Sequence, residues 1–126
     1  MFRRLLFCAV GLVGCIVAQA PGSYAGSWMS RANGGAGKLS LAFTTDALDS
    51  ATFSYEGQDV KTKPISLTKD GDRVEFVFEY TLDGNVLRST MQGNVTAKAV
   101  AGKYKSATAD GTTPVDEGTW EVTLKP

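Results

Sequence analysis

The residue types that most often carry out catalysis are scarce in this chain of 126 residues. It contains no histidine, and its two cysteines, Cys8 and Cys15, both lie close to the N-terminus. Without histidine the chain has no Ser-His-Asp or Cys-His arrangement and no histidine-based metal site. A Ser-Lys pair or a pair of carboxylates is then the remaining route to catalysis. We therefore predict that the protein is not an enzyme and uses no metal or other cofactor.

Several acidic residues stand beside glycines, where their carboxylates would be candidates for holding a cation. Asp70 and Asp72 flank Gly71, and Asp83 precedes Gly84. Calcium needs about six to eight oxygen ligands from a loop of defined spacing, and these positions do not match the twelve-residue pattern. Asp beside Gly is also the usual composition of a tight turn. The pattern predicts hairpin turns and no metal site.

Aromatic side chains are the better candidates for a binding surface. Phe76, Phe78 and Tyr80 stand at every second position, so they share one face of a strand. Trp28 and Trp120 each follow a glycine by two residues. Such a stripe either lines a ligand site or fills a core, and a small barrel allows both. On this basis we predict ligand contacts from Trp28, Phe76, Phe78, Tyr80 and Trp120.

Short β-strands would have to position these side chains. Apolar and polar residues alternate through the chain after Pro21, and no helical periodicity is sustained. Turn residues that tolerate positive φ separate the alternating segments. We expect strands at 24–32, 37–45, 50–56, 60–69, 73–82, 85–95, 97–106 and 116–125. Pro64 removes a ladder donor, so the strand at 60–69 should bend or begin late.

Eight short strands with tight connections predict an all-β fold, an antiparallel up-and-down meander that closes into a small barrel. A β-sandwich is the alternative, although sandwiches usually contain longer Greek-key connections. Residues 21–126 would form this single domain. Its inward-facing residues include too many large apolar side chains for an empty lumen. We expect a largely filled and dry barrel that binds at its open rim or outer surface.

The hairpin at 83–84 fixes part of the expected register. A two-residue type I′ turn there places Glu79 opposite Arg88 on the outer face and Tyr80 opposite Leu87 on the inner face. The exposed pair would then form a cross-strand ion pair.

The hairpin at 70–71 is expected to follow the same rule. A two-residue turn at Asp70-Gly71 would place Leu67 opposite Val74 and Ile65 opposite Phe76. Both leucine and isoleucine would then point into the barrel.

Glycine followed two residues later by an aromatic residue occurs at 26–28, 102–104 and 118–120. The glycine lets a neighbouring strand approach closely, and the aromatic shares its face of the sheet. The Gly-x-Trp opening and the meander resemble the lipocalin-like, or calycin, barrels. They resemble more closely small β domains of exported bacterial proteins that carry Gly-x-Trp at both ends. A closed meander makes the first and last strands neighbours, which would let the two tryptophans seal one end. The resemblance implies this barrel fold. It implies no particular ligand, because Thr45-Asp46 is not followed by the aromatic of the second lipocalin motif.

The N-terminus carries the pattern of an export signal. Arg3 and Arg4 precede an apolar run that is too short to span a bilayer. The small-x-small pattern at 18–20 predicts a signal peptide at 1–20, and with it a periplasmic or secreted protein. The alternative is a lipobox at 12–15, which would lipidate Cys15 and anchor the protein to a bacterial membrane.

Charge limits the classes of partner. The chain has 13 basic and 13 acidic residues, and removing Arg3 and Arg4 leaves a net charge of −2. Nucleic acids and anionic membrane surfaces both require clustered positive charge, so we expect no nucleic acid as a partner. A membrane is expected only if the chain is lipidated at Cys15. We predict a non-catalytic exported binding or interaction module, whose partner is a protein or a small apolar ligand. The alternatives are an inhibitor or accessory domain for an extracytoplasmic enzyme, using loops 32–36 and 107–114, and a lipocalin-like carrier of a small apolar ligand.

Overall fold

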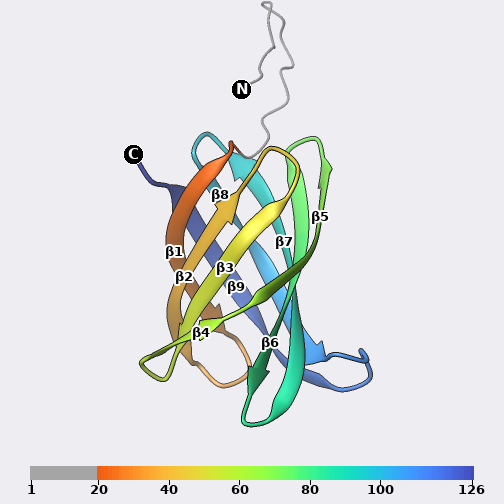
Figure 1. Cartoon of the computed structure of the whole chain (residues 1–126). Coiled ribbons are helices and arrows are strands. Elements are labelled where there is room, and N and C mark those ends of the chain that lie inside the picture. Colours follow the sequence, from red (N-terminus) through yellow and green to blue (C-terminus); the bar gives the residue numbers. More distant parts are fainter. Residues whose placement is uncertain (1–19) are drawn as a thin grey trace, which may run out of the picture.

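Strands and tight turns account for nearly all of residues 20–126, which are the residues that this computed structural model describes. They form an antiparallel meander that curls into a half-barrel (Figure 1). The all-β fold class is therefore confirmed. The nine strands are β1 (Gly22–Ser30), β2 (Ala36–Phe43), β3 (Leu48–Tyr55), β4 (Gln58–Lys61), β5 (Lys63–Asp70), β6 (Arg73–Leu82), β7 (Asn85–Thr96), β8 (Ala99–Thr108) and β9 (Pro114–Leu124).

The export signal and the alternative lipidation site at Cys15 lie outside the described residues, apart from Ala20. In residues 20–126 we find no helix with the length and apolar character to cross a membrane.

The sheet has the order β4-β3-β2-β1-β9-β8-β7-β6-β5, so β1 and β9 are neighbours as expected. Its two outer strands, β4 and β5, are consecutive in the chain and are separated only by Thr62. In Figure 1 they run as one bent ribbon from β3 to β6. The strand expected at 60–69 is thus divided in two, which gives nine strands where eight were predicted.

The division has a local cause near Pro64. Proline has no N–H to donate to a ladder, and the register of β5 on β6 shifts between Pro64 and Ser66. At the break, the hydroxyl of Thr62 donates a hydrogen bond of 2.8 Å to the carbonyl oxygen of Ala51 in β3. One bent segment therefore pairs with β3 through its first half and with β6 through its second half.

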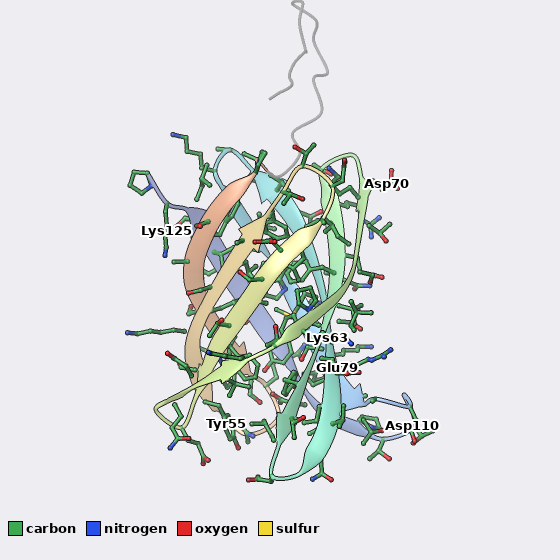
Figure 2. The ribbon with its side chains drawn as sticks, in the orientation of Figure 1. Tyr55, Lys63, Asp70, Glu79, Asp110 and Lys125 are labelled. Carbon is green, nitrogen blue, oxygen red and sulfur yellow. The ribbon has the colours of Figure 1, made fainter. Side chains whose placement is uncertain are left out.

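The predicted hairpin at 83–84 is confirmed. Asp83 and Gly84 have φ angles of 50° and 80°, as a type I′ turn requires at its two central positions. Glu79 pairs with Arg88, and their side chains form an ion pair of 2.9 Å. Figure 2 shows Glu79 on the outer surface.

The predicted register of the hairpin at 70–71 is wrong by two residues. Asp70 pairs with Arg73, so the turn residues are Gly71 and Asp72, and Leu67 faces Phe76. Gly71 takes the positive φ, 66°, that the first central position of such a turn requires. Because the shift is even, Leu67 keeps its inward face. The bulge turns Ile65 outward, where it is 40% exposed.

The core runs along the inner face of the sheet, and most of its fully buried side chains come from the strand segments toward the end where the chain enters β1 and leaves β9, the upper end in Figure 1. Tyr24 packs edge-to-face on Phe43 at 5.5 Å between ring centroids, and Phe43 packs on Phe76 at 5.6 Å. The sequence analysis did not single out Tyr24, although it shares a strand face with Gly26 and Trp28 and is only 1% exposed. The fully buried side chains are Tyr24, Phe76, Leu39, Val100 and Val122.

The glycines of the Gly-x-aromatic sites allow the neighbouring strands to approach closely, as expected. A Cβ on Gly26 would lie 1.8 Å from the backbone oxygen of Glu121, and one on Gly118 would lie 1.9 Å from that of Met29. Both strands therefore need glycine in order to cross this closely. Trp28 and Trp120 are direct partners in the β1–β9 ladder.

Candidate functional site

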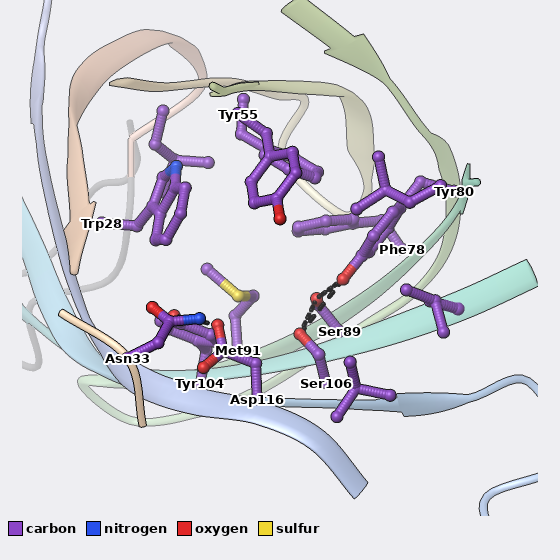
Figure 3. A pocket seen from close by; sticks show the side chains of 15 residues that line it. Trp28, Asn33, Tyr55, Phe78, Tyr80, Ser89, Met91, Tyr104, Ser106 and Asp116 are labelled. Atoms are coloured by element: carbon purple, nitrogen blue, oxygen red, sulfur yellow. Dashed lines mark hydrogen bonds between the residues drawn. The ribbon is translucent and has the colours of Figure 1, made fainter. Parts of the chain in front are cut away.

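The lower end of the half-barrel holds a cavity of about 130 Å³, which we call the cup (Figure 3). The turns at 31–35, 56–57, 83–84 and 109–113 lie at this end, and Figure 2 shows Tyr55 and Asp110 there, far from Asp70. The cup is lined by Trp28, Asn33, Leu39, Phe53, Tyr55, Phe78, Tyr80, Leu82, Leu87, Ser89, Met91, Tyr104, Ser106, Val115 and Asp116. The lumen is thus filled at the upper end, and an open space remains at the lower end.

Aromatic rings form the walls of the cup and stand at right angles to one another. Trp28 lies edge-to-face against Phe53 and against Tyr104, with centroid distances of 6.3 Å in both cases. Phe53 makes the same kind of contact with Tyr80 at 4.9 Å. The indole N–H of Trp28 donates to the carbonyl oxygen of Ser54 at 3.1 Å, which fixes the orientation of the ring. Neighbouring rings therefore stand nearly perpendicular to one another around the cavity.

A carboxylate lies in one wall of the cup, held by two hydroxyl groups. Ser30 donates to Oδ1 of Asp116 at 2.6 Å, and Tyr104 donates to Oδ2 at 2.7 Å. Burial raises the pKa of Tyr104 well above its ordinary value, and the hydrogen bond and negative charge of Asp116 raise it further. Tyr104 therefore stays protonated and remains a donor to Asp116.

A second polar group lies deeper, where three hydroxyls bond to one another. Ser89 and Ser106 are 2.6 Å apart, and the hydroxyl of Tyr80 lies 3.1 Å from Ser89 and 3.2 Å from Ser106. Both serines are buried. Among the residues lining the cup there is no histidine or lysine that could take a proton from either serine. The trio can supply hydrogen bonds inside the cup.

Tyr55 extends from the end of β3 into the cup. Figure 3 shows its hydroxyl pointing into the open space of the cup. No hydrogen bond joins this hydroxyl to another residue of 20–126 in the structure. It is therefore free to bond to a ligand.

A larger hollow of about 480 Å³ lies on the outer face, over β5 to β8. Exposed polar side chains form much of its surface, and some of them pair with each other, as Gln92 and Glu75 do at 2.8 Å. Its lining is about as polar as it is apolar, whereas small-molecule sites are lined mainly by apolar and aromatic side chains. We therefore take the cup as the candidate site.

The structure separates the five predicted contact residues into two groups. Trp28, Phe78 and Tyr80 line the cup. Phe76 and Trp120 are 0% and 3% exposed, pack edge-to-face on each other at 5.3 Å, and are not among its lining residues. The two tryptophans therefore do not seal an end together: Trp28 forms a wall of the cup, while Trp120 belongs to the core.

Three important lining residues were missed by the sequence analysis. Tyr104 was visible as the aromatic of the middle Gly-x-aromatic site. Asp116 stands two residues before Gly118 and four before Trp120, so strand alternation already places it on their face. Tyr55 gave no such signal, because the segment before Glu56-Gly57 alternates weakly.

No cluster of three or more metal-binding side chains occurs within residues 20–126. In comparisons with known proteins, no family model, no curated protein and no solved structure matches this chain. The fold itself, an antiparallel half-barrel made only of strands, is compatible with a calycin-like barrel.

Proposed function

We propose that the protein is a non-catalytic, exported binding module, and that the cup takes a small molecule with an apolar body. The observation that carries this proposal is the enclosure of the cup by aromatic walls with a few convergent polar groups. That composition is typical of small-molecule sites. The calycin-like arrangement, in which one end of a barrel receives the ligand, is consistent with it. Export rests on the signal-like N-terminal pattern.

The size of the cup limits what it can enclose. Its volume of about 130 Å³ is close to that of a cavity of roughly 150 Å³ that holds benzene. The cup therefore has room for one ring or one compact branched group, and a longer ligand would extend out of the mouth.

Surface apolar residues support a small ligand over a partner protein. The large hydrophobic residues exposed within 20–126 are Met29, Ile65, Val86 and Val115, and they lie on four different strands. A docking surface would be expected to gather such residues in one patch. An inhibitor or accessory domain is therefore the less supported alternative.

Two exposed valines near the lower end allow a matched test. Val115 is 49% exposed and lines the cup, whereas Val86 is 45% exposed and does not. Val115→Trp should obstruct the cup, and Val86→Trp should add the same bulk outside it. We expect phenol and cyclohexanol to bind saturably to the parent protein and to Val86→Trp, as followed by ligand-observed NMR. Binding should be lost in Val115→Trp.

Two results would contradict this proposal. One is equal binding to both tryptophan variants, which would place the site elsewhere. The other is the absence of saturable binding by any ring-sized probe, neutral or charged, to a protein whose circular dichroism shows an intact sheet.

A further inference from the structure

The cup has an unbalanced charge. Asp116 is the only charged residue among those that line it. The two ion pairs found within residues 20–126 are Lys69–Asp46 and Arg88–Glu79, so Asp116 has no cationic partner there. A half-buried carboxylate without a counter-ion is costly, and two hydrogen bonds offset only part of that cost.

The carboxylate also retains capacity for a ligand. An ionised carboxylate can accept about four hydrogen bonds, and Ser30 and Tyr104 supply two. Both of these partners are neutral donors that fix its position without cancelling its charge. Figure 3 shows Asp116 beside Tyr104 at the edge of the open space. An entering group thus meets a fixed negative charge with unused acceptor sites.

The walls provide the second feature that favours a cation. The ring face of Trp, Tyr or Phe attracts a positive charge, and boxes of aromatic rings bind alkylated ammonium groups in this way. Trp28, Phe53 and Tyr104 meet at interplanar angles of 89° and 90°, so their rings enclose a corner of the cup from different directions. Tyr55 and Tyr80 add two more rings. The same rings can also make apolar contacts with the methyl groups of such a cation.

From these two features we infer that the cup selects a small organic cation, such as an amine or a quaternary ammonium group. The inference rests on the proposed function and deepens it by naming the ligand class. The ammonium head occupies the aromatic box, with its charge facing Asp116. A head of this kind is close in size to the ring that the cup admits.

The test compares two probes of the same shape that differ in charge. Choline and 3,3-dimethylbutan-1-ol share their branched head, with nitrogen replaced by carbon in the alcohol. Titration calorimetry at constant ionic strength should show choline binding at least about tenfold more tightly than the alcohol. Asp116→Asn should remove most of that preference and leave the affinity for the alcohol within about twofold.

A second pair of variants keeps the test decisive if Asp116→Asn unfolds. Trp28→Leu retains an apolar wall but loses the aromatic face, whereas Trp28→Phe retains a face. Trp28→Leu should weaken the binding of choline more than the binding of the alcohol. Trp28→Phe should largely keep the preference for choline over the alcohol.

The outcomes separate the two proposals. Equal or tighter binding of the alcohol to the parent protein overturns the cation inference and leaves the apolar site intact. A choline preference that survives both Asp116→Asn and Trp28→Leu also overturns it, because the charge would then be recognised elsewhere. If neither probe binds and phenol and cyclohexanol do not bind either, the proposed function itself fails.

Discussion

The hydroxyl of Tyr104 in β8 donates a 2.7 Å hydrogen bond to the carboxylate of Asp116 in β9. The bond crosses the ladder of the two strands that form one wall of the cup. The position of the Asp116 carboxylate, the single charged group of the cup, therefore depends on Tyr104 staying protonated.

This link predicts a loss of stability at high pH. The pKa of Tyr104 is raised in the folded state, chiefly by burial and then by Asp116, so the unfolded chain loses this proton first, near pH 10. The stabilising contribution is complete below about pH 10 and is lost as pH rises above it. Urea unfolding from about pH 8 to about pH 11 should show a steeper decline for the parent protein than for Tyr104→Phe. Parallel declines would exclude Tyr104 as the cause.

A second titration is expected at the tip of the β8–β9 connection. Oδ1 of Asp110 accepts hydrogen bonds from the hydroxyl of Thr108, and from the backbone and hydroxyl of Thr112, which lower its pKa to about 2. Because the folded pKa is depressed, the contribution to stability is present above the unfolded pKa of about 3.9 and is lost as pH falls toward 2.

The double variant Thr108→Val/Thr112→Val should raise the pKa of Asp110 toward its ordinary value, as measured by NMR titration of the side-chain carboxyl. Thr123→Val, an exposed change on β9 far from this loop, serves as the control and should leave the pKa unchanged. An Asp110 that titrates near 4 in the parent protein would refute the hydrogen-bonded turn.

Phe76 provides a test of the core. It is 0% exposed and contacts the rings of Phe43 and Trp120. Phe76→Ala should therefore lower the free energy of unfolding by about 3–5 kcal/mol. Ile65→Ala, at the exposed bulge of β5, should cost less than about 1 kcal/mol. Similar losses for the two variants in denaturant melts would mean that the inner and outer faces of this hairpin are misassigned.

The fold was largely predictable because alternation and turn chemistry are local signals. Asp83-Gly84 specified both a turn type and a register, since both of its residues tolerate positive φ. The turn after Asp70 was mispredicted because Gly71 can serve as either the first or the second turn residue. Only the pairing of Asp70 with Arg73 across the ladder decides between them.

The candidate site was less predictable, for a geometric reason. Alternation assigns Phe76 and Phe78 to the same face of β6, and the structure confirms that both are buried. Alternation does not say how far along the barrel each ring lies. That position depends on the tilt of the strands and on the stagger between them. Both are set only when the whole sheet curls into a barrel. Phe78 reaches the cup and Phe76 does not, and no pattern within β6 distinguishes them.

The most direct test of the account uses the two tryptophans of the chain as internal reporters. Trp28 lines the cup, and Trp120 is buried in the core with its indole N–H bonded to the carbonyl oxygen of Lys103 at 3.0 Å. In a ¹⁵N-labelled sample each tryptophan gives one indole N–H signal. Titration with choline should shift the Trp28 signal saturably while the Trp120 signal stays nearly fixed. If the Trp28 signal does not move while choline binds, or if the Trp120 signal moves in its place, the ligand does not enter the cup and the account is wrong.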